Sequence, residues 1–329
     1  MKKLQISYGE QYLAWLLGAG DGSHPTNPVR AKLATEKLEQ RLGVGVEILD
    51  PMPAGERDFW VDAVKSVHDA DYVDRVLAGH SSEWFGVKPE MGETALAMFA
   101  GTGRLVQRVL RGEASVVFNP QGAKHHAQRN FGSGFCVFND MAWAAIQFKK
   151  AGMRPLYLDW DIHAGDGVFH MLLGEGIPTI SIHRSDIYPN DERMNSGAVA
   201  RDIVDESVAS YNYNVPGGAT DDDFIAAIDK AGAVIDANRP DVILLAAGAD
   251  GYTGRGALGQ LANYTEHGFK YAANMVVEMA VKHAQGRVVI GGAGGYQPLD
   301  HTPEVWAAVV ETIANAIATN QISKLKEAS

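Results

Sequence analysis

The chain has 329 residues, of which 46% are hydrophobic and 21% are charged. This composition excludes disorder as the main state and supplies enough apolar residues for a large core. Acidic residues outnumber basic ones by 40 to 29, and the net charge of -11 disfavours binding to nucleic acid or to an anionic membrane. We therefore expect a globular protein with no nucleic-acid or membrane partner.

The cysteine content and the first residues bear on the compartment. Cys136 is the single cysteine, which excludes an intrachain disulfide and favours a reducing environment. The early apolar run "YLAWLLG" is too short to span a bilayer, and no secretory pattern surrounds it. We expect a soluble, cytoplasmic protein, and a homo-oligomer is compatible with the sequence.

Short apolar runs alternate with longer amphipathic segments along the whole chain. The expected strands are Leu4–Tyr8, Val44–Leu49, Ser115–Asn119, Pro155–Asp161, Thr179–His183, Tyr211–Val215, Val242–Ala247 and Val288–Gly291. The expected helices are Pro28–Leu42, Glu93–Arg111, Asp140–Ala151, Asp222–Asn238, Tyr264–His283 and Thr302–Thr319. Asn139 and Asp221 are candidate helix caps.

Strands separated by helices are typical of βαβ units, and near-continuous apolar strands are typical of a parallel sheet that is covered on both faces. No repeat, low-complexity tract or linker divides the chain. We therefore expect one α/β domain over residues 1–329, with three layers (α/β/α) around a mainly parallel sheet. Residues from about 320 to 329 are expected to form a frayed tail.

Polar side chains follow four of the expected strands. They are His125 and His126, then His163, Asp250 and Tyr296. Ligands of open α/β sheets bind beyond the carboxyl ends of the strands, so these residues are expected to converge although they are far apart in sequence.

The stretch "LYLDWDIHAGDG" places Asp159, Asp161 and His163 two residues apart at the end of an apolar run. In a strand this spacing puts all three on one face, while Leu158, Trp160 and Ile162 take the other. Two buried carboxylates beside an imidazole would take up protons unless a cation or strong donors hold them ionised. The stretch therefore predicts a metal site.

Each feature taken alone has a simpler explanation. Asp250 fits a turn, the histidine pair fits a surface loop, and "GGAGGY" fits a tight turn. A dinucleotide loop at "GGAGGY" is disfavoured because Gln297 stands where the third glycine belongs. The occurrence of all these features at one edge of the sheet is what favours a catalytic site.

The segments "HPTNPVR", "GAKHHA", "GSGFCVFND", "DWDIHAGDG", "TISIH", "GAD" and "GGAGGY" occur in this order. In order and spacing the chain resembles the zinc-dependent histone deacetylases of the arginase/deacetylase superfamily, most of all the bacterial acetoin-utilisation-type deacetylases and related amidohydrolases. The resemblance covers His24 to Tyr296. It implies an eight-stranded sheet and a metal-dependent deacetylase.

The resemblance also implies the ions. Asp161, His163 and Asp250 match the family's zinc ligands, and three protein ligands leave a position open for water and substrate, as in catalytic zinc sites. Whether zinc or Fe²⁺ is used stays open. Asp159 and Ser181 match positions near a structural monovalent cation, K⁺ in the simplest case.

By the same resemblance, His126 accepts the proton of the attacking water, with His125 beside it. Asp159 and Asp166 orient the first and second histidine, respectively, and raise their basicity. Tyr296 donates a hydrogen bond to the developing oxyanion. The implied reaction is hydrolysis of an N-acyl amine.

Further positions match the family's substrate channel. Phe135, Gly134 and Tyr188 would surround an aliphatic chain, and Arg30 would line an inner pocket where acetate leaves. Ala164 departs from the family pattern, where a second histidine is common. The rim loops also depart, so the substrate stays open between acetylated lysine in proteins and a small acetylated amine or polyamine.

Two other classes of function stay as alternatives. A ureohydrolase on the same fold needs a second metal and further aspartates, arranged as "DxHxD", which "GADGYTG" lacks. A catalytically silent binding protein would be expected to lose Tyr296, a metal ligand or the histidine pair, and all of these are present.

Overall fold

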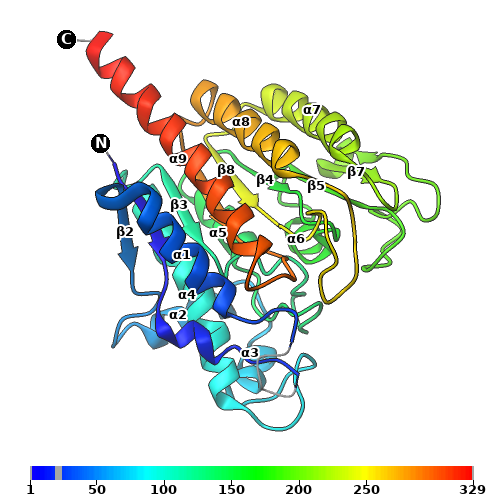
Figure 1. Ribbon diagram of the computed structural model, residues 1–329. Helices are drawn as coiled ribbons and strands as arrows, with labels where there is room; N and C mark the ends of the chain where they lie inside the picture. The colour runs from blue at the N-terminus through cyan, green and yellow to red at the C-terminus, as the bar shows by residue number, and fades with distance from the viewer. Residues whose placement is uncertain (1, 19–23, 328–329) are drawn as a thin grey trace.

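A central sheet with helices on both faces forms the structure, which is a computed structural model that describes residues 2–18 and 24–327 (Figure 1). The strand order is β2-β1-β3-β9-β8-β4-β5-β7-β6. All neighbours are parallel except β6, which runs antiparallel to β7 at one edge. The strands are β1 Leu4–Ser7, β2 Val46–Leu49, β3 Val116–Asn119, β4 Pro155–Asp159, β5 Thr179–Arg184, β6 Ile203–Asp205, β7 Ser210–Val215, β8 Val242–Ala246 and β9 Val288–Gly291.

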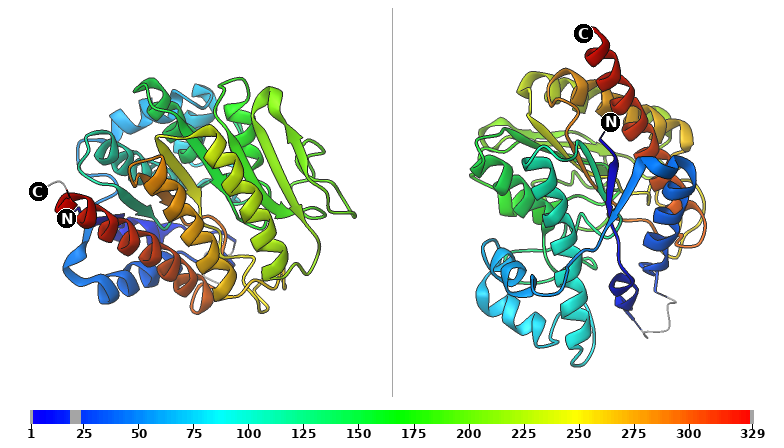
Figure 2. Two further views of the ribbon diagram at one scale, coloured as in Figure 1. Left: turned by 90° about the horizontal axis from the view of Figure 1, so that it is seen from above. Right: turned by 90° about the vertical axis from the view of Figure 1, so that its left-hand side faces the viewer.

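Two helical layers cover the sheet, one on each side (Figure 2, left). The first layer consists of α1 Val29–Leu42, α7 Asp221–Asn238, α8 Glu266–Lys282 and α9 His301–Glu327. The second contains α2 Arg57–Lys65, α3 Ala70–Leu77, α4 Pro89–Leu110, α5 Asp140–Lys150 and α6 Asp166–Leu172. Short 3₁₀ helices span Glu10–Ala14, Gly43–Gly45 and Glu206–Val208. No described helix is both long and apolar enough to cross a bilayer.

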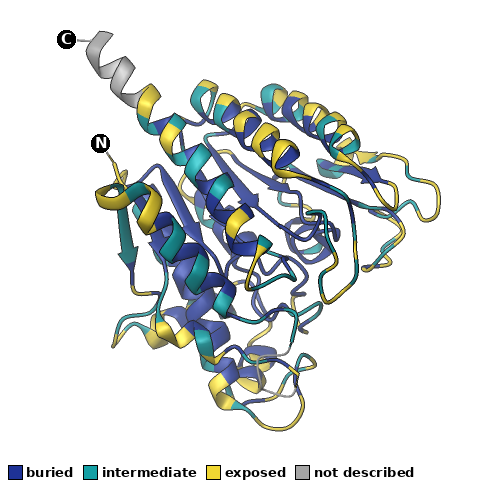
Figure 3. Cartoon of the chain, viewed as in Figure 1, coloured by how far each residue is buried: buried dark blue, intermediate teal, exposed yellow. Residues whose placement is uncertain are grey.

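Each face of the sheet has its own hydrophobic core (Figure 3). Successive strand residues point to opposite faces, so Leu156 and Leu158 of β4 pack under the first helical layer while Tyr157 packs under the second. Trp160 and Ile162 continue the first set and are fully buried, as the spacing predicted. Burial on both faces explains the near-continuous apolar strands.

The three-layer α/β/α architecture is confirmed, but the sheet has nine strands where eight were expected. The unexpected strand is β6, a largely exposed edge strand of 3 residues, which is too short to form a recognisable apolar run. Helices α2, α3 and α6 were also not predicted. Helix α9 continues to Glu327, through most of the stretch for which a frayed tail was expected.

Two local predictions were wrong. Strand β4 ends at Asp159 and not at Asp161, because the Asp159 carboxylate accepts the backbone N–H of Asp161 at 2.9 Å and turns the chain out of the sheet. Helix α7 is capped by Thr220, which forms a capping box with Asp223, and Asp221 lies in the first turn. The cap at Asn139 is confirmed, since its side chain accepts the N–H of Ala142 at 3.0 Å.

Helix α4 contacts α2 so closely that one glycine is required. A Cβ atom at Gly103 would overlap the ring of Trp60, which is fully buried. We predict that Gly103→Ala lowers the free energy of unfolding by about 1–3 kcal/mol despite the better helix propensity of alanine. Chemical denaturation measures the change. The matched control is Gly232→Ala in α7, where a Cβ would meet only the flexible side chain of Met275, and equal losses in both variants would contradict the packing argument.

Candidate metal centre and active site

The site lies at the carboxyl ends of four adjacent strands, β3, β9, β8 and β4. The loop after β3 carries His125 and His126, and the loop after β4 carries Asp161 and His163. Asp250 follows β8 and Tyr296 follows β9. The structure therefore brings together segments that are separated by more than a hundred residues, as the sheet argument predicted.

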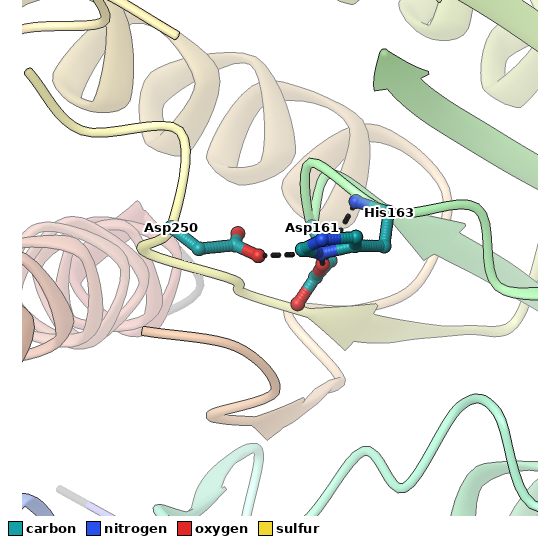
Figure 4. A group of neighbouring side chains, drawn as sticks. All are labelled: Asp161, His163 and Asp250. Atoms are coloured by element: carbon teal, nitrogen blue, oxygen red, sulfur yellow. Dashed lines mark hydrogen bonds and ion pairs between the residues drawn. The ribbon is translucent and has the colours of Figure 1, made fainter. Parts of the chain in front are cut away.

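Asp161, His163 and Asp250 form a compact, buried cluster (Figure 4). Their ligand atoms all lie within 4.8 Å of one another. The His163 Nδ1 atom is 3.1 Å from Asp161 Oδ1 and 2.9 Å from Asp250 Oδ2. The two carboxylates and the imidazole nitrogen thus converge on one point.

Backbone amides hold the two carboxylates in place. The N–H of His163 donates to Asp161 Oδ1 at 2.9 Å, and the N–H of Gly294 donates to Asp161 Oδ2 at 2.6 Å. The N–H of Ile162 donates to Asp250 Oδ1 at 3.0 Å. These contacts orient the ligands before any ion binds, because backbone donors in fixed loops cannot rotate away.

The electrostatics of this cluster favour a cation. Burial and the neighbouring charge of Asp161 raise the pKa of Asp250 to about 6. The two carboxylates raise the pKa of His163 to about 10, against the effect of burial. Two carboxylate oxygens and one imidazole nitrogen match the ligands of a catalytic zinc centre with one open position. The cluster therefore fits a divalent metal ion.

His125 and His126 are adjacent in sequence, and each has its own carboxylate. His125 Nδ1 lies 2.8 Å from Asp159 Oδ2, and His126 Nδ1 lies 2.7 Å from Asp166 Oδ1. Asp159 also accepts the hydroxyl of Tyr157 at 2.6 Å. In both histidines the Nδ1 atom is occupied, which leaves Nε2 to face the site.

The two imidazoles differ in charge state. Burial would lower the pKa of His125, but Asp159 and Asp161 outweigh it and raise the pKa to about 9. Burial and the positive charges of His125 and His163 hold the pKa of His126 well below its ordinary value. At neutral pH, His126 is therefore the imidazole that can accept a proton.

Aromatic side chains surround the approach to this cluster. The ring of Tyr296 lies 6.0 Å from that of His163 and 6.5 Å from that of Phe135. The ring of Tyr188 lies 4.9 Å from that of His126, and its hydroxyl contacts Ser133. Tyr188 is 42% exposed, so these rings lead from solvent to the buried histidines.

The backbone beneath the Phe135 ring is tightly constrained. Gly134 has φ +55°, and a Cβ atom there would overlap the ring of His126. Phe135 itself has φ +66°, and the Glu83 carboxylate accepts its N–H at 2.6 Å. Such a conformation is costly for a non-glycine residue and is typical of functional loops.

Ser181 lies beside Asp159, its register partner across β4 and β5. Its hydroxyl is 2.8 Å from His183 Nδ1 and accepts the N–H of Gly165 at 3.4 Å. The structure thus brings together the two residues expected near a monovalent cation, and both are buried.

Arg30 is buried on the far side of Tyr296. Its Nη1 donates to the Gly295 carbonyl at 2.6 Å, and its guanidinium lies 5.1 Å from the centroid of the Trp306 ring. A cavity joins Arg30 to Tyr296 and His125, and Lys124 lines the same cavity. Lys124 was not predicted as a site residue, although it precedes the histidine pair directly.

A second group that the sequence did not predict supports Asp166. Gln128 donates to Asp166 Oδ2 at 2.9 Å, and its carbonyl oxygen lies 2.8 Å from His170 Nδ1. His170 Nε2 in turn lies 2.7 Å from Asp191, on the rim loop. These residues connect Asp166, the partner of His126, to the rim loop. The only sequence signal for His170 is that it lies four residues after Asp166, which in a helix places both on one face.

Residues 24–313 match the sequence pattern of the histone deacetylase domain. The chain belongs to the histone deacetylase family. This membership places it among hydrolases that act on amide bonds. The match begins at His24 and includes every cluster described above.

Curated relatives agree with this assignment. The chain is 30% identical over 312 residues to the acetoin utilization protein AcuC of Bacillus subtilis, with 87% of this chain and 76% of the relative covered. It is 29% identical to a protein of Archaeoglobus fulgidus named "Probable deacetylase", with 88% and 82% covered. It is also 29% identical to histone deacetylase B of Dictyostelium discoideum, with 69% and 56% covered.

The cluster geometry gives a prediction for metal binding. We predict that Asp250→Asn reduces the metal content from about one ion per chain to near zero, because it removes one of three ligands while the two cores stay intact. Elemental analysis after dialysis against Zn²⁺ measures the content, and Zn²⁺ should raise the melting temperature of the wild type only. The control is Asp236→Asn on α7, where the carboxylate pairs with Lys282. Undiminished metal in Asp250→Asn would remove this residue from the site.

Proposed function

We propose that this deacetylase-family chain is a zinc-dependent amidohydrolase that removes an acetyl or other short acyl group from an acylated amine. The observation that carries the proposal is the convergence of the Asp161, His163 and Asp250 ligand atoms beside His126, a neutral imidazole with its own carboxylate. Among the described residues a single group of three such ligands converges, which does not favour the two-metal ureohydrolase alternative.

In this proposal Asp161, His163 and Asp250 hold the zinc ion, with Fe²⁺ as the alternative. When bound, the ion supplies Lewis-acid chemistry: it polarises the amide carbonyl and acidifies a water molecule. His126 accepts the proton of that water through Nε2, while Asp166 accepts the Nδ1–H and stabilises the imidazolium that forms. His125, already charged, stabilises negative charge nearby.

Tyr296 donates its hydroxyl proton in a hydrogen bond to the developing oxyanion. Burial and the charges of Asp250 and Asp161 raise its pKa well above the ordinary value, so the hydroxyl stays protonated as a donor requires. Phe135, Gly134 and Tyr188 form the channel for an aliphatic chain. Arg30 lines the inner end, where the released acid is held.

We further propose that Asp159 and Ser181 lie at a structural K⁺ site, which would stabilise the loop that presents Asp161. The chain is proposed to act as one catalytic domain in the cytoplasm, without a nucleic-acid or membrane partner. The amine stays open between acetylated lysine in proteins and a small acetylated amine or polyamine. The names of the relatives support a deacetylase and do not fix this choice.

The direct test is hydrolysis by the zinc-loaded protein. We expect release of free amine from acetyl-lysine peptides or from acetylated polyamines, lost on chelation and restored by Zn²⁺, because the ligand cluster is the proposed source of activity. Amine release is measured for both substrate classes side by side. Absence of hydrolysis of every acyl amine by a protein that contains one zinc per chain would contradict the proposed function.

Tyr296 provides the sharpest test of mechanism, because the change removes one oxygen atom. We predict that Tyr296→Phe retains zinc and has a KM near that of the wild type, yet loses roughly 10²- to 10³-fold in kcat, as when one oxyanion donor is removed. The matched control is Tyr271→Phe on α8, where the hydroxyl bonds Asp229 at the surface. A kcat for Tyr296→Phe within about threefold of the wild type would show that the hydroxyl does not contact the oxyanion.

A further inference from the structure

Two cationic side chains are buried at the inner end of the site. Lys124 is 8% exposed and Arg30 is 2% exposed, and both line the cavity that reaches His125 and Tyr296. Neither position is a metal ligand or a member of the histidine–aspartate pairs. In the proposed mechanism the acyl part of a substrate lies near Tyr296, and Tyr296 lines this cavity together with the two cations.

The hydrogen-bonding capacity of these cations is largely unused. No described residue accepts a hydrogen bond from the Lys124 ammonium, which lies 5.5 Å from the centroid of the Trp15 ring. The guanidinium of Arg30 makes one hydrogen bond, to the Gly295 carbonyl, and its Nε has no partner among the described residues. Buried charges in native proteins are paired with a counter-ion or with hydrogen-bond acceptors, whereas among the described residues Lys124 has no acceptor and Arg30 has one.

The nearby carboxylates are already engaged. Asp140, next to Lys124, accepts hydrogen bonds from the Thr102 hydroxyl at 2.5 Å and from the backbone N–H groups of Ala123 and Lys124 at 3.0 and 2.8 Å. The Glu83 carboxylate accepts the N–H of Phe135, and the other nearby carboxylates belong to the metal cluster or to the two histidines. Within the described part of the chain, no free anion faces the cavity.

The other cavity walls do not supply an anion either. Apart from the His125 imidazole, which is cationic, they consist of backbone and uncharged side chains such as Thr26 and Cys136. Burial raises the pKa of the Cys136 thiol to about 12, which keeps it neutral. Burial lowers the pKa of Lys124 to about 8, so the ammonium remains the main form at neutral pH. Among the described residues, therefore, none that lines the cavity offers a free carboxylate to the two cations, and a bound ligand can supply one.

We propose that Lys124 and Arg30 form a carboxylate-binding subsite that selects acyl groups ending in a carboxylate, such as succinyl or glutaryl groups. This inference rests on the proposed amidohydrolase function. Before hydrolysis, a neutral acetyl group would offer neither cation an anionic acceptor, whereas a terminal carboxylate offers four acceptor positions to the two of them. In the reaction, water adds across the amide C–N bond and releases the free amine and a dicarboxylic acid.

The first measurement compares substrates of equal size. Peptides with succinyl-lysine are compared with peptides carrying 4-methylpentanoyl-lysine, a neutral chain of similar shape, with acetyl-lysine as the reference. We expect the wild type, loaded with zinc, to show a kcat/KM at least about 10-fold higher for the succinyl chain than for its neutral counterpart, since hydrogen bonds to charged groups are the strong ones. Malonyl and glutaryl chains then measure the reach of the subsite.

The second measurement assigns the preference to the lysine. Lys124→Met should lower the succinyl-to-neutral ratio by roughly 10- to 100-fold, and Lys124→Arg should retain most of it. The control Lys150→Met removes the same charge from the exposed end of α5 and should leave the ratio unchanged. Circular dichroism checks that each variant is folded. If Lys124→Met does not fold, the succinyl-to-neutral ratio of Lys124→Gln is compared with that of the wild type instead.

Several outcomes would overturn the subsite. One is a wild type that hydrolyses acetyl and neutral chains faster than succinyl chains, and another is a folded Lys124→Met enzyme with an unchanged ratio. Equal rates for charged and neutral chains, with inhibition by free acetate that Lys124→Met relieves, would mean that the cations hold the product instead. Hydrolysis of none of the peptides by zinc-loaded protein would contradict the amidohydrolase function itself, which separates the two failures.

Discussion

The structure depends on the enclosure of two aspartate carboxylates, those of Asp161 and Asp250, side by side and away from water. Burial and mutual repulsion both oppose their ionised state. One of the backbone amides that hold them, that of Gly294, approaches where a side chain would not fit. A Cβ at Gly294 would overlap both carboxylates, and one at Gly248 would overlap the backbone of Asp161. The glycines in "GAD" and "GGAGG" are therefore required by this close approach, and the three strand ends form one unit with the metal ligands.

The same constraint explains how much could be predicted from the sequence. Short, near-continuous apolar runs identified eight of the nine strands, and the residues after them pointed to the candidate metal cluster, because both depend on local pattern and on the geometry of parallel sheets. The end of β4 was misplaced because a side-chain oxygen of Asp159 takes the backbone N–H of Asp161, which would otherwise bond to a neighbouring strand. Strand propensities of the residues do not reveal such a hydrogen bond. Helices α2 and α3 escaped prediction because they are short, with few turns over which to show a period.

Side chains that act through packing were harder to predict than those at strand ends. Lys124 reads as an ordinary loop lysine, and only the closed fold shows that it is buried beside Arg30. Gln128 directly follows the segment "GAKHHA" and His170 lies in α6, and the two hold Asp166 through two hydrogen bonds in series. Such partners depend on distances across the chain, which sequence spacing does not determine.

The pair His125 and His126 shows why adjacent identical residues need different surroundings. Were both imidazoles charged, neither could accept a proton, and their rings lie only 3.9 Å apart. The structure resolves this by giving His125 the stronger negative environment of Asp159 and Asp161, and its charge then keeps His126 neutral. The neutral state of His126 is thus a property of the whole cluster. In the proposed mechanism, a metal ion that neutralised Asp161 would therefore also shift the balance between the two histidines, which links metal occupancy to proton acceptance through the carboxylate that they share.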